Sequence, residues 1–145
     1  MSWIAALDPG RSKCGLVLVD LDQRCVIEGH VLPVNAVVDT LKRWQRSTPP
    51  ERLIMGNGTS SDDWIAQLPA DLPVTMVDER GTTLKARSRY WQLWTPRGWR
   101  RLVPLGLQLP PDELDAVAAL VMLEEDLGFQ LQWLKPSPIR TGPSR

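Results

Sequence analysis

The sequence of 145 residues predicts an α/β fold, in which a mixed five-stranded sheet is flanked by helices. The first observation is that three apolar runs near the N-terminus are separated by short polar turns, which is typical of antiparallel strands. The second is that strands then alternate with amphipathic helices, which adds two parallel strands. We expect one domain over residues 1–135. Residues 136–145, rich in proline, serine and arginine, are expected to form a disordered tail.

The first three strands are expected at residues 4–7, 14–20 and 24–32. Pro9-Gly10 is a strong turn signal between the first two, so Asp8 lies at a strand tip. A carboxylate there either caps the turn through backbone N–H groups or points into a cleft as a metal ligand. This stretch by itself favours the cap.

The remaining elements follow from apolar spacing and from helix caps. An amphipathic helix is expected over residues 34–45 and strands over 52–56 and 74–77. Two further helices are expected, one capped by Ser60 or Ser61 and one by Thr82 or Thr83. The last helix follows the prolines that end at Pro111, with Asp112, Glu113 and Asp115 in its first turns, and it continues to Gly128.

Lysine plus arginine equals aspartate plus glutamate, 17 each, so net charge predicts no partner. The charges are nevertheless unevenly distributed. A stretch without acids carries Arg80, Lys85, Arg87, Arg89, Arg97, Arg100 and Arg101, and a later stretch without bases carries Asp112, Glu113, Asp115, Glu124, Glu125 and Asp126.

The sequence predicts a cytoplasmic protein with no membrane partner. No apolar run approaches the roughly 20 residues of a membrane span, and the N-terminus lacks the features of a signal peptide. Cys14 and Cys25 are expected to be reduced thiols, and neither has zinc-site spacing. With His30 as the single histidine, a metal would need oxygen ligands.

Four carboxylates could converge at one edge of the predicted sheet. Asp8 ends the first strand, Glu79 follows the fifth, and Asp112 and Asp115 are three residues apart on a helix. Such a group suits Mg²⁺ or Mn²⁺, and two ions could clamp a phosphodiester. The alternative is that each acid caps a turn or a helix. Whether Asp78 or Glu79 faces the site stays open, because alternation allows only one of them inward.

Several motifs resemble the YqgF-like branch of the RNase H-like, RuvC-type nuclease superfamily. These are Leu7-Asp8-Pro9-Gly10 with Gly15, Gly56-Asn57-Gly58-Thr59, Asp78-Glu79-Arg80 with Thr82-Thr83, and Asp115-Ala116 with the apolar helix that follows. The resemblance implies an RNase H-like sheet in which Asp8, Glu79 and Asp115 are metal-binding catalytic acids. Asp112 matches an additional acid of RuvC-type resolvases. Residues 90–111 have no counterpart.

We therefore expect a metal-dependent endonuclease that uses two Mg²⁺ or Mn²⁺ ions to hydrolyse structured nucleic acid. The substrate is either branched DNA, such as a Holliday junction, or a ribosomal RNA precursor, and a homodimer is possible. Basic and aromatic residues suited to phosphate contact and base stacking are Arg11, Lys13, Arg80, Lys85, Arg87, Arg89, Trp94, Arg97, Arg100 and Arg101.

Two other functions are compatible with the sequence. One is an RNase H-like nucleic-acid-binding module without useful turnover. The other is an actin-like ATPase or sugar kinase, suggested by Asp8, Gly10 and Gly15, although that two-lobed architecture needs a longer chain.

Overall fold

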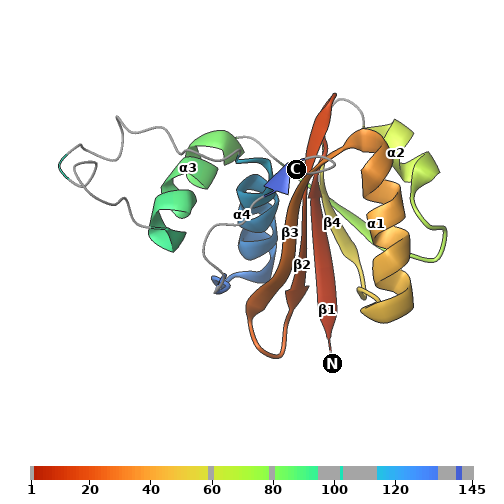
Figure 1. The fold of residues 1–145 in the computed structure, drawn as a ribbon, viewed down its shortest axis with the longest axis horizontal. Coiled ribbons are helices and arrows are strands. Elements are labelled where there is room, and N and C mark those ends of the chain that lie inside the picture. The colour runs from red at the N-terminus through yellow and green to blue at the C-terminus, as the bar shows by residue number, and fades with distance from the viewer. Residues whose placement is uncertain are drawn as a thin grey trace.

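The chain folds into a central sheet with helices on both faces (Figure 1). The strand order is β5-β4-β1-β2-β3-β6. The computed structural model describes residues 2–58, 61–78, 81–94, 102, 114–133 and 140–141.

The N-terminal part of the sheet is antiparallel. It consists of β1 (Trp3–Asp8), β2 (Lys13–Asp20) and β3 (Cys25–Pro33). The parallel part adds β4 (Leu53–Gly56) beside β1 and β5 (Val74–Val77) beside β4. The predicted mixed five-stranded sheet is thereby confirmed. A two-residue sixth strand, β6 (Arg140–Thr141), pairs with β3 and lies within the stretch expected to be a disordered tail.

Within the described ranges, four helices cover the sheet. On one face lie α1 (Val34–Ser47) and α2 (Ser61–Gln67), and on the other lie α3 (Thr82–Leu93) and α4 (Asp115–Leu127) (Figure 1). Since α4 lies between the sheet and α3, residues 116–124 are all buried. This position explains the nearly continuous apolar run in that helix.

Strand alternation separates two cores. In β1, Ala5 and Leu7 pack against the α1 side, whereas Ile4 and Ala6 pack against the α4 side. Trp44 of α1 belongs to the first core. Successive residues of β1 therefore alternate between the core on the α1 side and the core on the α4 side.

The starts of α3 and α4 differ from the sequence-based prediction. No threonine side chain caps α3; its N-cap is Gly81, with a φ of 75°. Thr82 is the first helical residue and is buried, so its side chain faces the core. The helix α4 begins at Asp115 after Leu114, and Asp112 and Glu113 lie outside the described residues. Its end at Gly128, with a φ of 84°, is as predicted.

Two further expectations concern the cysteines and the membrane. Cys14 and Cys25 are free thiols, as predicted. Among the residues that the structure describes, none of the helices has the length and apolar character needed to cross a bilayer.

A charged group connects β3 with α1. Arg43 Nη2 donates to Glu28 Oε1 at 2.9 Å, and His30 Nε2 lies 2.9 Å from the same oxygen. Burial raises the pKa of Glu28, but the hydrogen bonds from Arg43 and His30 outweigh it and lower the pKa from 4.5 to about 2. The ionised carboxylate is therefore favoured by the folded state.

Glu28 should make stability depend on acid pH. Its contribution is complete above pH 4.5 and is lost as the pH falls toward about 2, because the folded-state pKa is the lower one. The Glu28 side chain is 28% exposed, so we expect a contribution of about 2 kcal/mol after allowance for solvent screening. Urea unfolding from pH 7 to pH 3 should show a weaker pH dependence for Glu28→Gln than for the wild type. Parallel curves for the two proteins would contradict this assignment.

Candidate functional site

Asp8 is the last residue of β1 and lies opposite Gly15 of β2. By alternation it shares the face of Ile4 and Ala6, which is the side covered by α4. In the parallel part of the sheet, Leu7 is in register with Met55, and Met55 with Met76. The carboxyl ends of β1, β4 and β5 therefore meet at one edge of the sheet, with Asp8 among them.

The helix α4 brings Asp115 to the same place. Asp115 is its first residue and is half-buried. A methyl group on Gly15 would overlap the Asp115 carbonyl and would lie 2.7 Å from the Ala116 nitrogen. The backbone of α4 thus touches β2 at Gly15, the residue paired with Asp8. Asp8 and Asp115 consequently lie on the same face, on either side of this glycine.

The buried thiol of Cys14 responds to both acids. Burial raises the pKa of Cys14 above its ordinary 9.0, and the hydrogen bond that its S–H donates to the Gly10 carbonyl lowers it. The charges of Asp8 and Asp115 each raise this pKa further. Both carboxylates are therefore close enough to Cys14 to act on it electrostatically.

The end of β5 completes the edge. The Asn57 N–H donates to the Val77 carbonyl at 2.9 Å, so β4 and β5 stay paired to their last residues. Val77 packs on the α4 side, and the exposed Asp78 follows it. Glu79 and Arg80 lie outside the described residues. Of the Asp78-Glu79 pair, only Asp78 therefore belongs to the described residues.

The described residues contain two of the four expected acids. Asp8 and Asp115 are brought together, whereas Glu79 and Asp112 fall outside the described ranges. Within those ranges, no group of three or more histidine, cysteine, aspartate or glutamate side chains could hold a metal ion. Carboxylate oxygens are nevertheless the donors that Mg²⁺ and Mn²⁺ prefer. The donor chemistry of Asp8 and Asp115 therefore fits such an ion.

The expected nucleic-acid contacts fall into different settings. Arg11 is exposed in the turn that follows Asp8, and Lys13 is exposed at the start of β2. Trp94 is half-buried and packs on the α4 side, where its ring centroid lies 5.0 Å from that of Tyr90 and 5.1 Å from that of Trp133. Four of the expected contacts lie outside the described residues: Arg80, Arg97, Arg100 and Arg101.

Arg89 was predicted to contact nucleic acid, but its side chain is only 11% exposed and is bonded within the fold. Its Nε and Nη2 atoms donate to the two Glu124 carboxylate oxygens at 2.9 Å each. Arg89 Nη2 also donates to the Leu131 carbonyl, and the Leu131 N–H donates to Glu124, each at 2.7 Å. Arg89 therefore has a structural role that its position in a basic stretch did not reveal.

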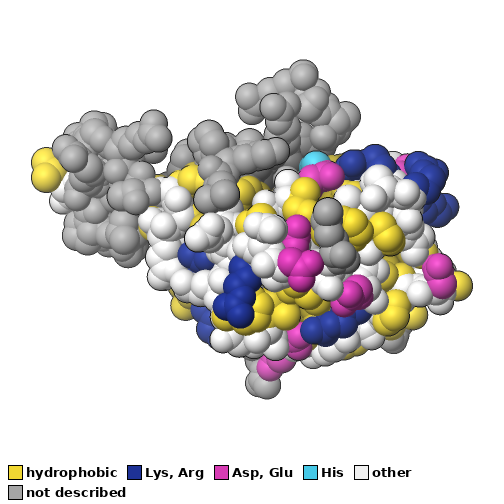
Figure 2. All heavy atoms as spheres, turned by 90° about the horizontal axis from the view of Figure 1, so that it is seen from below, with side chains coloured by type: hydrophobic (Ala, Val, Ile, Leu, Met, Phe, Trp, Pro, Cys, Tyr) yellow, Lys and Arg dark blue, Asp and Glu magenta, His cyan; other side chains and the backbone are white. Residues whose placement is uncertain are grey.

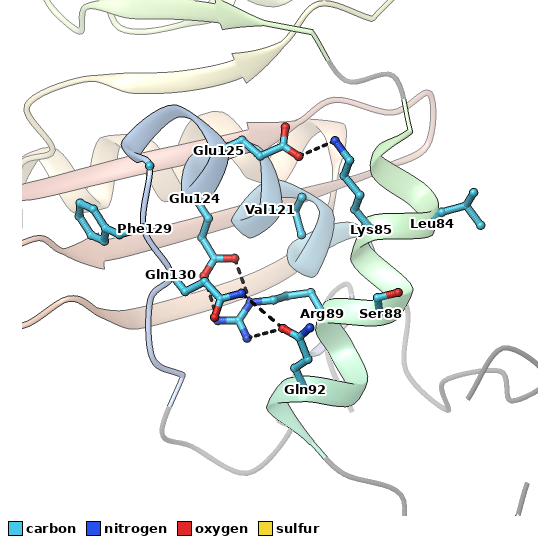
Figure 3. A pocket seen from close by; sticks show the side chains of 11 residues that line it. Leu84, Lys85, Ser88, Arg89, Gln92, Val121, Glu124, Glu125, Phe129 and Gln130 are labelled. Carbon is cyan, nitrogen blue, oxygen red and sulfur yellow. Dashed lines mark hydrogen bonds and ion pairs between the residues drawn. The ribbon is translucent and has the colours of Figure 1, made fainter. Parts of the chain in front are cut away.

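The same helix pair forms an open groove of about 490 Å³ (Figure 3). Lys85 pairs with Glu125 at 2.7 Å on one wall, and the Arg89–Glu124 pair lies beside Gln92 and Gln130. The groove lies near the Gly128 end of α4, whereas Asp115 lies at the other end. This groove is thus separate from the acids at the carboxyl edge of the sheet.

The acids near the end of α4 are each paired with a base. Besides the two pairs in the groove, Arg52 Nη2 binds Asp126 Oδ2 at 2.9 Å. The face shown in Figure 2 likewise has acidic and basic side chains interspersed. The acidic and basic stretches of the sequence therefore neutralise each other in part. The sequence offered one clue, that the two stretches have opposite charge.

The strand order and the helices on both faces define an RNase H-like fold of the RuvC type. Two solved structures of Thermus thermophilus RuvC share this fold, each with a TM-score of 0.51 and 15% sequence identity. The structure of RuvC in complex with a Holliday junction substrate matches over 90% of this chain and 99% of that chain. The second RuvC structure matches over 87% and 96%. No protein-family profile and no curated protein matches the sequence.

Proposed function

We propose that this protein is a metal-dependent endonuclease of the RuvC type, related to the YqgF-like branch, that acts on structured nucleic acid. One observation carries the proposal: at the carboxyl edge of the sheet, Gly15 pairs with Asp8 and also meets the backbone of Asp115. The fold shared with RuvC supports it. The substrate is branched DNA or a ribosomal RNA precursor.

Asp8 and Asp115 would hold Mg²⁺ or Mn²⁺, together with Glu79 and Asp112. Bound ions of this kind supply an activated water and stabilise the leaving oxygen of a phosphodiester. The protein contributes the fixed placement of its carboxylates. Strand pairing opposite Gly15 sets the position of Asp8, and the contact of α4 with that glycine sets the position of Asp115.

The sheet parity supports Glu79 over Asp78 as the third acid. Val77 packs on the α4 side, so an extended chain beyond it would direct residue 79, and not residue 78, to the side of Asp8. We therefore propose Glu79 as a ligand. The exposed Arg11 and Lys13 would contact the phosphate backbone beside the acids.

The test is cleavage of a four-way DNA junction and of a structured precursor RNA with Mg²⁺ or Mn²⁺. We expect activity in the wild type and none above background in Asp8→Asn, Asp115→Asn or Glu79→Gln, because each loses a ligand charge. Asp39→Asn is a matched control, since Asp39 is exposed on α1 across the sheet, and it should cut normally. Cleavage that persists in Asp8→Asn would refute the proposal. Salt-sensitive binding without any cleavage would instead identify a binding module.

A further inference from the structure

The helix α3 has two charged flanks with different surroundings. Its basic residues occupy alternate positions at Lys85, Arg87 and Arg89. Because a helix has 3.6 residues per turn, Lys85 and Arg89 share one flank, and Arg87 shares the opposite flank with Trp91.

The bases of the first flank are paired with carboxylates of α4. Lys85 binds Glu125 at 2.7 Å, and Arg89 binds Glu124 through two hydrogen bonds of 2.9 Å. A base that already has a carboxylate partner gives little net charge to a polyanion. This flank is therefore poorly suited to phosphate.

The second flank has donors without acceptors. Arg87 Nε and Trp91 Nε1 are both buried, and neither has a hydrogen-bond partner among the described residues. Trp91 is 6% exposed, whereas Arg87 as a whole is half-buried, so part of its side chain reaches the surface. A buried donor left without a partner costs about 1–3 kcal/mol, which an arriving acceptor would relieve.

Other unpaired groups lie elsewhere in the fold. Trp44 Nε1 and Thr48 Oγ1 are also buried and make no close hydrogen bond to the described residues, but they belong to α1 and its end, across the sheet, where Trp44 faces Glu28. On the α4 side, the described groups of this kind are the two donors of α3, spaced four residues apart.

We propose that Arg87 and Trp91 together bind one phosphate group of the nucleic-acid backbone, an assignment that rests on the proposed function. Arg87 supplies the charge, and Trp91 supplies a neutral N–H donor. Arg87 lies five residues into α3, about 8 Å along the helix from Thr82. The strand before this helix, β5, ends at the edge that carries Asp8. A nucleic-acid strand that runs from this edge along α3 would pass Arg87 and then Trp91.

The test measures how binding depends on salt. The probes are a fluorescent four-way DNA junction and a fluorescent structured RNA, titrated with full-length protein in chelator at several salt concentrations. The slope of log affinity against log salt concentration reports how many phosphates the protein neutralises. In duplex DNA, each neutralised phosphate adds about 0.9 to the magnitude of this slope. We expect Arg87→Gln to weaken binding about tenfold and to reduce the magnitude of the slope by about 1.

Three further variants separate charge from hydrogen bonding. Arg87→Lys should retain the slope with weaker binding, because it keeps the charge and loses the Nε donor. Trp91→Phe should weaken binding about threefold to tenfold without changing the slope, as expected for one neutral hydrogen bond. Lys85→Gln is the matched control on the opposite flank and should change neither quantity. Thermal melts verify that each variant is folded.

The assignment is overturned if folded Arg87→Gln retains the wild-type slope, or if Lys85→Gln lowers it equally. The outcome is independent of cleavage. If Arg87→Gln reduces the slope relative to the wild type as expected, but Asp8→Asn still cuts, the proposed catalytic site fails and the phosphate contact stands. If the wild type binds neither probe, both proposals fail.

Discussion

Gly15→Ala is expected to lower the free energy of unfolding by about 3 kcal/mol and to abolish cleavage. The added methyl group would overlap the backbone carbonyl of Asp115, and a backbone atom cannot turn away as a flexible side chain can. Overpacking of this kind costs about 1–3 kcal/mol, and a clash with backbone belongs at the upper end of that range. The start of α4 must therefore shift, which moves Asp115 away from Asp8. Urea unfolding and a cleavage assay on the same preparation measure the two effects.

Gly128→Ala is the matched control for this substitution. Gly128 also receives one methyl group, but no heavy atom lies within 4 Å of the position it would occupy. The cost is limited to the left-handed backbone, with a φ of 84°, and should be about 1 kcal/mol. Cleavage should persist in this variant. Equal stability losses in the two variants would mean that the contact between Gly15 and α4 is not tight.

Arg89→Met alone is expected to destabilise the protein by about 3–5 kcal/mol, because it leaves the Glu124 carboxylate buried without its cation. Glu124 is only 8% exposed, and it would retain one hydrogen bond, from the Leu131 N–H. Chemical unfolding at neutral pH measures the loss.

The double variant Arg89→Met with Glu124→Leu should recover most of that stability. Replacement of both members of a buried ion pair by apolar residues is often nearly neutral, although the Leu131 backbone groups would still lose their partners. Lys85→Met is the exposed control, and removal of its pair with Glu125 should cost less than about 1 kcal/mol. If Arg89→Met is as mild as Lys85→Met, then the Arg89–Glu124 pair is not protected from water as its burial indicates.

The Arg89–Glu124 pair also shows why the uneven charge distribution of the sequence was misleading in part. A basic stretch followed by an acidic stretch suggested a surface for nucleic acid next to a solvated helix. In the fold, α3 and α4 lie together, so Lys85 and Arg89 meet Glu125 and Glu124. Arg87, on the opposite flank, has no such partner among the described residues. Two arginines only two positions apart, Arg87 and Arg89, therefore have different surroundings.

The sequence by itself determined the elements and the position of Asp8 at a strand tip. These features depend on local patterns: apolar alternation, the Pro9-Gly10 turn, and the helix periodicity that predicted a helix over residues 34–45. In the structure, this helix continues two residues further, to Ser47. The prediction that the last helix ends at Gly128 also depended on a local feature, because it needed only a glycine able to adopt a positive φ.

Only the tertiary structure decided which of these residues meet. The contact between Gly15 and Asp115 joins segments far apart in the chain, and it depends on how closely α4 packs against β2. The partners of Arg89 and the orphan donors of Arg87 and Trp91 likewise follow from how α3 lies on α4. Such contacts leave no periodic signal in the sequence, because packing distances between elements are set by the whole core and not by neighbouring residues.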